Sequence, residues 1–268
     1  ENSHELVRNL WEVNQVVTAK NFQECYNDAL FYRDEVRELF RRGQVSLGDR
    51  ALGDNITLAI LEKVAAELRV TEKQYPELDN LPEILADTYY GNFSLFQSLP
   101  DVWAIDQVFP VMPIHRLQEA PNRDAVIADI TCDCDGKIDH FANAKGIKRT
   151  TRLHSLNEGE EYYLGVFLVG AYQETLGDLH NLFGDTNVVS VHINADGSYD
   201  FVREFHGDSI ADVLSYVEYD TKIMTEEFRQ RAENAVKNGK ITAAKRKQMM
   251  KAFKASLDGY TYFEKEEH

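Results

Sequence analysis

The sequence has no apolar run near the roughly 20 residues that a membrane-spanning helix needs. Residues 1–4 are polar, so the start of the chain also lacks the apolar core of a secretory signal peptide. We therefore expect neither a membrane partner nor export. Internal repeats and low-complexity segments are missing as well. The chain opens on Glu1 rather than methionine, and we expect a processed product or a fragment.

Cysteine is scarce. Cys25, Cys132 and Cys134 form an odd set with no disulfide framework, so we expect a reducing compartment and a cytoplasmic protein. Positive charge is scarce too: the sequence has 29 Lys and Arg against 45 Asp and Glu, which gives a net charge of −16. Such a surface repels phosphates, which disfavours a nucleic-acid partner, and it is compatible with a cationic small substrate.

The order of elements predicts an α+β fold. Apolar residues recur at helical spacing in 4–90, for example Leu6, Leu10, Val13 and Val17, and the last short helix of this region is expected to end near Tyr90. Strands are expected next, and helices return from residue 208. We predict three domains: an N-terminal helical bundle (1–92), a central antiparallel β-barrel or sandwich (93–207) and a C-terminal helical domain (208–268).

Several local patterns refine this expectation. A crowded aromatic and proline-rich stretch, 93–113, should pack tightly and irregularly, and residues 143–160 read as a polar loop. Strands are predicted at 125–132, 162–172 and 188–193. Ala195-Asp196-Gly197 predicts a hairpin turn into a strand at 199–205. Helix starts are predicted from the capping-box spacing of Ser209 and Asp212, from Thr225 and from Thr242, and helix ends from Asn238-Gly239 and Gly259.

The segment TCDCDG (131–136) carries the first candidate site. A strand ending at 131–133, followed by a turn at Asp135-Gly136, would gather Asp133, Asp135 and Asp139 around the Cys132 thiol. Negative neighbours keep a thiol protonated, which suits a proton donor, and grouped carboxylates suit a guanidinium. Composition alone favours a half-buried core thiol. A metal site of Cys132, Cys134 and His140 and a strained Cys132–Cys134 disulfide are the weaker alternatives.

The second candidate is Tyr172, at the end of the apolar stretch 165–172. Small residues, Gly170 and Ala171, precede it and would let a ligand or another backbone approach its hydroxyl. A core tyrosine that donates to a backbone carbonyl fits the pattern equally well. For Asp178, His180 and Asp185 we favour loop structure and helix capping over a metal site.

Both blocks resemble the biosynthetic arginine decarboxylases, pyridoxal-phosphate enzymes of the alanine-racemase-like fold type III. The resemblance covers most of 80–265 and is weaker in the N-terminal bundle, which fits a helical insertion of that branch. The matching segments are 90–98, 103–110, 131–139, 170–174, 177–184 and 259–262. Cys134 departs from the pattern, where a small polar residue is expected, and should carry no chemistry.

The resemblance implies the roles of the site residues. Cys132 would return a proton to the substrate carbon after CO₂ leaves. Asp133 would contact the distal cation of L-arginine, with Asp135 a weaker candidate for that role. Tyr172 would lie near the cofactor phosphate. It also implies agmatine as product, a place in putrescine, spermidine and other polyamine biosynthesis, a homodimer or tetramer, and a possible need for Mg²⁺.

The parts that would hold pyridoxal 5′-phosphate are missing from the sequence. The cofactor needs a Schiff-base lysine and a glycine-rich phosphate loop. Lys63 lies on a helical stripe and Lys137 in a turn, and no glycine-rich loop precedes a helix. In the family these parts come from a TIM barrel that precedes this region. We therefore expect the C-terminal portion of such an enzyme, inactive alone; the alternative is a non-catalytic regulatory or assembly relative.

Overall fold

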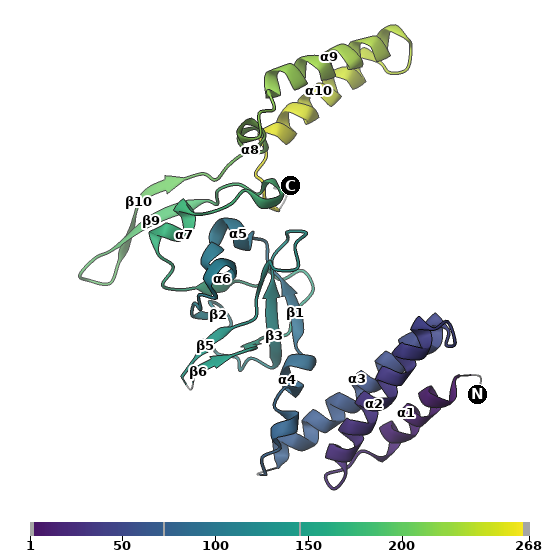
Figure 1. Ribbon diagram of the computed structural model, residues 1–268. Coiled ribbons are helices and arrows are strands. Elements are labelled where there is room, and N and C mark those ends of the chain that lie inside the picture. The colour runs from purple at the N-terminus through teal and green to yellow at the C-terminus, as the bar shows by residue number, and fades with distance from the viewer. Residues whose placement is uncertain (1–2, 72, 145, 265–268) are drawn as a thin grey trace. The chain divides into compact units, whose positions relative to one another are not determined.

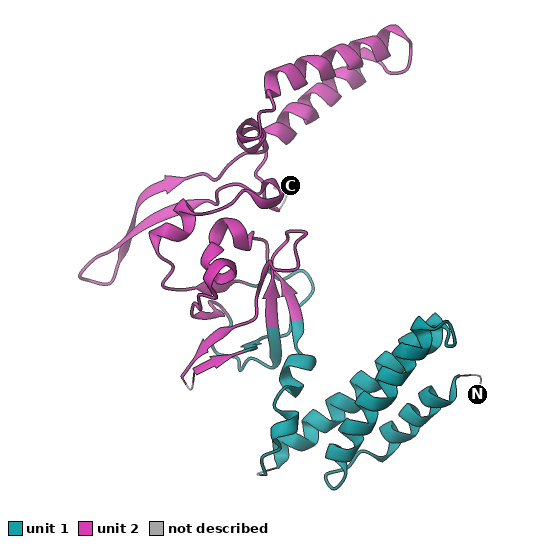
Figure 2. Ribbon diagram, viewed as in Figure 1, with its two compact units in different colours: residues 1–87, 116–125, 149–162 teal, residues 88–115, 126–148, 163–268 magenta. Residues whose placement is uncertain are grey.

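The computed structural model describes residues 3–71, 73–144 and 146–264. The fold is α+β, as predicted, with helices towards both ends of the chain and short, mostly antiparallel strands between them (Figure 1). Contacts divide the chain into two compact units, each described by itself (Figure 2). Unit 1 comprises 1–87, 116–125 and 149–162; unit 2 comprises 88–115, 126–148 and 163–268.

Three long helices open unit 1: α1 (Glu5–Val16), α2 (Phe22–Arg41) and α3 (Leu47–Val70). The Ser46 hydroxyl caps α3 by accepting from the backbone N–H of Asp49. Their apolar stripes meet in one core, so the predicted helical bundle is confirmed. Its largest fully buried side chains include Leu10, Val36, Ile60, Leu61 and Val64.

The bundle continues through η1 (Pro76–Leu78) and α4 (Leu81–Ile84). The prediction that the last helix ends near Tyr90 is wrong, because β1 (Asp87–Tyr90) is a strand. Its threonine and two tyrosines favour extended backbone. The Asp87 carboxylate also accepts from the Arg123 guanidinium at 2.9 Å, which ties this strand to β3.

Strand β3 (Arg123–Ala128) runs from unit 1 into unit 2 and is the longest strand of its sheet. In unit 1 it pairs with β7 (Thr151–Leu153), and in unit 2 with β1 and with β4 (Lys137–Ile138). The region predicted as a polar loop, 143–160, therefore contains β7. It also contains β6 (Gly146–Lys148), which pairs with β5 (Phe141–Asn143).

Two predicted strands are too long. The strand predicted at 125–132 ends at Ala128. The carboxylate of the next residue, Asp129, accepts from the backbone N–H of Thr131, and this bond bends the chain into a turn. The strand predicted at 162–172 is reduced to β8 (Leu164–Val166), which pairs with β2 (Val111–Pro113). Leu168 has a left-handed φ of 61°, which is incompatible with a strand.

The compact stretch predicted at 93–113 is half helical. It contains α5 (Leu95–Ser98) and α6 (Pro100–Ile105) ahead of β2. Ser94 caps α5 by accepting from the N–H of Gln97, at 3.3 Å. Tight packing is confirmed only in part: Leu95, Phe96, Leu99 and Phe109 are buried, whereas Trp103 is 55% exposed.

The predicted hairpin is confirmed as β9 (Val188–Ile193) and β10 (Tyr199–Phe205). Its turn closes with an N–H to O=C bond of 2.8 Å from Asn194 to Ser198, and Gly197 supplies a φ of 85°. Among the residues that the structure describes, the strands form one four-stranded and three two-stranded sheets, and none closes into a barrel.

Three helices end unit 2: α8 (Ile210–Tyr216), α9 (Thr221–Lys237) and α10 (Ala243–Leu257). The capping box of Ser209 and Asp212 is confirmed, as is the cap at Thr242. Helix α9 begins one turn before the predicted Thr225, because the Asp220 carboxylate accepts from two backbone N–H groups. The domain boundaries at 92/93 and 207/208 stay predictions.

Candidate active site

The Cys132 loop, residues 129–136, joins β3 to β4 in unit 2. Its two ends are closed by the Asp129 N–H, which donates to the Gly136 carbonyl at 2.8 Å. Inside the loop, the Gly136 N–H donates to the carbonyl of Asp133 at 3.2 Å. The Asp135 N–H donates to the Asp133 carboxylate at 3.0 Å. These bonds restrain the backbone of the loop.

Asp129 anchors the loop, and the sequence analysis missed it. Its side chain is only 3% exposed, yet its carboxylate is well satisfied. One oxygen accepts from the Leu95 N–H at 2.8 Å, and the other accepts from the Thr131 N–H at 3.0 Å and the Thr131 hydroxyl at 2.7 Å. A Cβ on Gly136 would lie 2.2 Å from this carboxylate, which explains the glycine.

Cys132 is exposed at the surface of the loop. Its backbone N–H donates to Oδ1 of Asn181 at 2.9 Å, and Nδ2 of Asn181 lies 3.3 Å from Cys132 Sγ. Asn181 belongs to η2 (His180–Leu182), 49 residues further along the chain. The reading of Cys132 as a half-buried core thiol is therefore wrong. No local signal in the sequence connects the two residues.

The carboxylates are arranged differently from the expectation. The thiol within 4.8 Å of both Asp133 and Asp135 is that of Cys134, whereas Cys132 lies against Asn181. Asp139 pairs with Lys137 at 3.1 Å and with His140 at 2.8 Å. The three predicted carboxylates therefore do not form one shell around Cys132.

The cluster of Asp133, Cys134 and Asp135 has the spacing of metal ligands. It differs from the predicted trio of Cys132, Cys134 and His140. Its groups lie on one exposed turn, where acidic side chains are common without a metal. Its two carboxylates remain available for a cation such as a guanidinium, so the predicted roles of Asp133 and Asp135 stay predictions.

Tyr172 lies in α7 (Ala171–Thr175) rather than on a strand, and it is 76% exposed. The alternative of a core tyrosine is therefore wrong. Its neighbour Gln173 is buried and fixes α7 to α6: the Gln173 amide donates to the Asp101 carboxylate at 2.5 Å and accepts from the Asp101 N–H at 3.2 Å. Among the described residues, no hydrogen bond, ion pair or ring contact joins Tyr172 to the Cys132 loop.

The segment after α7 is fastened to α5. The Asp178 N–H donates to the Phe96 carbonyl at 2.9 Å, and the Gln97 amide donates to the Asp185 carboxylate at 2.6 Å. The His180 ring lies 4.5 Å from that of Phe96. Burial and the neighbouring Asp208 carboxylate raise the pKa of Asp185 against the effect of this hydrogen bond. These contacts fit the predicted loop role of Asp178, His180 and Asp185.

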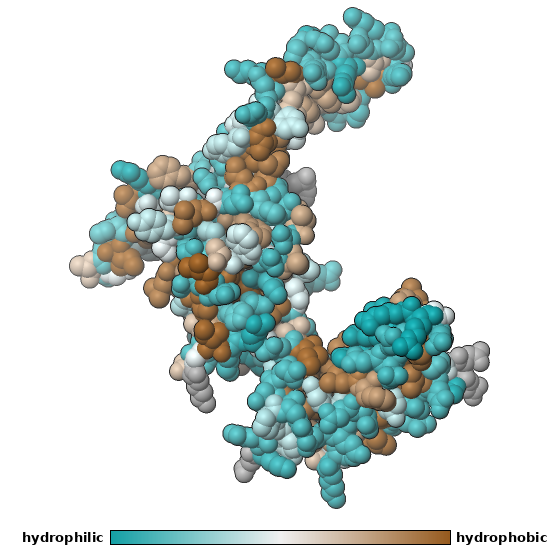
Figure 3. Space-filling view, in the orientation of Figure 1, coloured by the Kyte–Doolittle hydropathy of each residue, from teal (hydrophilic) through white to brown (hydrophobic). Residues whose placement is uncertain are grey.

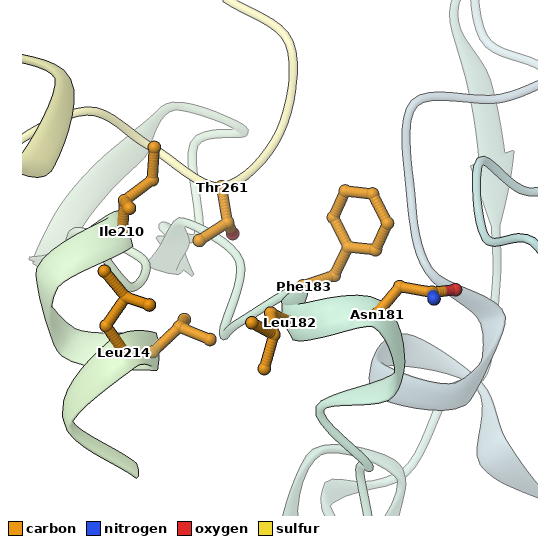
Figure 4. A pocket seen from close by; sticks show the side chains of 7 residues that line it. Asn181, Leu182, Phe183, Ile210, Leu214 and Thr261 are labelled. Carbon is orange, nitrogen blue, oxygen red and sulfur yellow. The ribbon is translucent and has the colours of Figure 1, made fainter. Parts of the chain in front are cut away.

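The C-terminal tail fastens the other end of this segment. The Gly184 N–H donates to the Thr261 hydroxyl at 3.1 Å, and the buried Tyr262 hydroxyl donates to the Gly184 carbonyl at 2.8 Å. Burial raises the pKa of Tyr262. Between the segment and α8 lies a small, mostly apolar pocket of about 170 Å³ (Figure 4). It is lined by Asn181, Leu182, Phe183, Ile210, Val213, Leu214 and Thr261.

Two family models match the chain. The arginine decarboxylase helical bundle domain matches residues 1–82, which include α1–α3, η1 and the start of α4. The arginine decarboxylase C-terminal helical extension matches residues 210–263, which include α8–α10. The two matches lie on either side of the Cys132 loop and the Tyr172 helix.

Similar proteins span the region between these matches as well. The biosynthetic arginine decarboxylase of Gloeobacter violaceus is 44% identical over 99% of the chain, and that of Rhodopirellula baltica is 45% identical over 96%. The crystal structure of the biosynthetic arginine decarboxylase SpeA from Campylobacter jejuni is 32% identical and superposes with a TM-score of 0.80 over 98% of the chain. The chain belongs to the biosynthetic arginine decarboxylase family.

Membership in the biosynthetic arginine decarboxylase family comes with a difference in length. The chain covers 42% of the Gloeobacter violaceus protein, 38% of the Rhodopirellula baltica protein and 42% of the Campylobacter jejuni chain. It therefore spans about two fifths of the length of the curated relatives it matches. More than half of each relative has no counterpart in this chain.

The residues present fit only the periphery of a pyridoxal-phosphate site. The phenol of Tyr172 is exposed and could donate to a phosphate. A Schiff-base lysine needs a pocket around it, but every lysine that the structure describes, Lys63 and Lys137 among them, is exposed at the surface.

In the described ranges, no helix combines the length and apolar character needed to cross a membrane.

Proposed function

We propose that this chain supplies the proton donor and the substrate-recognition groups of a pyridoxal-phosphate-dependent arginine decarboxylase. The reaction converts L-arginine to agmatine and CO₂ and feeds polyamine synthesis. The observation that carries this proposal is the exposed Cys132 thiol on a hydrogen-bonded loop that also carries Asp133 and Asp135. The family membership of the chain supports the choice of arginine.

Each proposed residue has a chemical task. When bound, pyridoxal phosphate draws electrons from the α-carbon of the substrate and so lets the carboxyl group leave as CO₂. The Cys132 S–H then gives its proton to that carbon. Asp133, and second to it Asp135, pairs with the guanidinium through charge-assisted hydrogen bonds. The Tyr172 hydroxyl donates to the cofactor phosphate without adding charge.

The rest of the active site is proposed to come from a TIM-barrel portion that carries the Schiff-base lysine. The exposed lysines and the length of the relatives support this. So does an uncovered apolar face of the β9–β10 hairpin, where Figure 3 shows hydrophobic residues at the surface. That face consists of Val189, Val191, Ile193, Tyr199 and Phe201, each at least 48% exposed. A two-stranded hairpin with such a face is marginal alone and calls for a covering partner.

The test is Cys132→Ala in the protein reassembled with the barrel portion. We expect assembly to be unchanged and agmatine formation to fall by a factor of about 10² to 10⁴, the usual contribution of a general acid. Cys134→Ser is the matched control, because it removes the neighbouring thiol from the same loop, and it should keep most of the activity.

Two results would contradict the proposal. Equal losses for Cys132→Ala and Cys134→Ser would mean that the loop, rather than the Cys132 proton, matters. Intact assembly without any decarboxylation by the unmodified protein would favour a regulatory or assembly relative. The homodimer or tetramer, the need for Mg²⁺ and the cytoplasmic location also remain proposals.

A further inference from the structure

The Asn181 side chain makes two hydrogen bonds with Cys132. Its Oδ1 accepts the Cys132 backbone N–H at 2.9 Å, and its Nδ2 donates towards Cys132 Sγ at 3.3 Å. Sulfur is a weak acceptor, and distances of this length are normal for it. The amide therefore fixes the backbone of Cys132 and occupies one side of its sulfur. The Cys132 S–H bond therefore points away from the Asn181 amide.

The backbone that presents Asn181 is unusual. Asn181 and Leu182 both have left-handed φ values, 58° and 61°. Asparagine tolerates this conformation, but a bulky leucine does not adopt it without cost. Strain of this kind persists only where the surrounding contacts impose it, and it often marks a functional position.

The surrounding contacts do impose it. Ahead of Asn181, the Asp178 N–H is bound to the carbonyl of Phe96. After it, the Gly184 N–H donates to the Thr261 hydroxyl, and the Gly184 carbonyl accepts from the Tyr262 hydroxyl. The segment cannot relax without breaking these bonds, so the Asn181 amide is held in place against Cys132. Figure 4 shows Asn181 on this segment, next to Leu182 and Phe183.

We propose that Asn181 is the positioning residue for the Cys132 thiol. It orients the sulfur so that the S–H bond is free to break as a C–H bond forms on the substrate. Its N–H group then stabilises the thiolate that remains, until the thiolate takes a proton from solvent. This role rests on the proposed function of Cys132, but its effect on the thiol can be measured in the chain itself.

The decisive variant is Asn181→Asp in a Cys134→Ser background. Aspartate tolerates the left-handed backbone and keeps the acceptor for the Cys132 N–H. It replaces the donor to sulfur with a negative charge, which disfavours the thiolate. The probe is iodoacetamide at one fixed, near-neutral pH. It reports on Cys132 because Cys25 is only 3% exposed, and Cys132→Ser checks this assignment.

We expect alkylation of Cys132 to slow about tenfold in Asn181→Asp, because the added negative charge lowers the thiolate fraction. Asn234→Asp is the matched control, because it adds the same charge at an exposed position of α9, and it should leave the rate unchanged. Equal rates in Asn181→Asp and Asn234→Asp would overturn the proposal. A purely structural role predicts that equality, because the bond to the backbone is kept.

The reassembled enzyme gives a second readout. We expect Asn181→Asp to lower kcat for arginine and to leave KM nearly unchanged. Added to Cys132→Ala it should cost nothing more, because the group it positions is already gone. An additional loss in the double variant would contradict the proposal. If the reassembled wild-type protein shows no decarboxylation but the alkylation difference persists, the proposed function fails while the positioning of the thiol stands.

Discussion

The two units bury their apolar residues very differently. The helices of unit 1 enclose a continuous core in which Leu10, Ile60 and Val64 have essentially no exposed surface. In unit 2, the β9–β10 hairpin leaves apolar side chains of both strands in solvent, with Phe201 60% and Ile193 73% exposed. The bundle has the packing of a self-sufficient domain, and the hairpin has that of a surface that another portion covers. The candidate site lies in the unit whose packing is incomplete.

The chain offers one tryptophan in each unit to follow this difference. Trp11 lies on α1 of unit 1 and Trp103 on α6 of unit 2. Trp103→Phe therefore leaves a fluorescence signal for the bundle, and Trp11→Phe leaves one for unit 2. The predictions below use these two single-tryptophan backgrounds in urea unfolding.

The largest effect is expected in the bundle core. Leu61→Ala should lower the free energy of unfolding by about 3 kcal/mol, because Leu61 is 1% exposed and its loss leaves a cavity. Trp11 fluorescence measures it. Val191→Ala on the hairpin, followed by Trp103, should change the free energy by less than about 0.5 kcal/mol. Similar losses of unfolding free energy in Leu61→Ala and Val191→Ala would contradict the difference in packing between the two units.

The next effect concerns the anchor of the Cys132 loop. Asp129→Ala removes the acceptor of the buried Leu95 N–H and both contacts with Thr131. A buried donor without a partner should cost unit 2 about 2 kcal/mol, as measured through Trp103. Asp135→Ala changes an exposed carboxylate of the same loop and should cost little. A harmless Asp129→Ala would mean that the loop is held by other contacts.

A smaller effect is expected at the start of α8. Ser209→Ala removes the hydroxyl that accepts from the Asp212 N–H and should cost about 1 kcal/mol. The same hydroxyl lowers the pKa of Asp212 by hydrogen bonding. This contribution is present above the unfolded pKa of Asp212 and is lost as the pH falls through its folded pKa. The cost of Ser209→Ala should therefore shrink in acid; a constant cost would contradict this coupling.

The smallest effect is expected at Asp185, with the opposite sign. Burial, and then the Asp208 carboxylate, raise its pKa, so the folded state binds this proton more tightly than the unfolded state does. Its contribution to stability is present below the unfolded pKa and is lost as the pH rises through the folded pKa. Asp185→Asn keeps the acceptor for Gln97 and should give a slight gain at neutral pH. Urea titrations at several pH values would contradict this if the gain grew in acid.

The parts of the fold that depend on neighbouring residues could be predicted from the sequence. Helical spacing identified the bundle, Asp196-Gly197 located the hairpin turn, and the pair Ser209 and Asp212 identified a helix start. Each of these signals lies within a few residues of the structure that it specifies.

The parts that depend on distant contacts could not be predicted. The strand before Cys132 ends early because Asp129 reaches Leu95, 34 residues away in the sequence. The partner of the Cys132 sulfur, Asn181, is 49 residues away and has no motif of its own. Tyr172 is exposed on a helix because the strand before it ends at Val166 and Leu168 is left-handed, which the apolar sequence did not indicate.

Agmatine formation tests most directly whether this chain needs another portion for activity. The purified chain is incubated with arginine and pyridoxal phosphate, first alone and then with the polypeptide that corresponds to the unmatched part of the relatives. We expect no agmatine from the chain alone and robust formation from the mixture, lowered by a factor of about 10² to 10⁴ in Cys132→Ala. Robust agmatine formation by the chain alone would contradict the division of the active site that we propose.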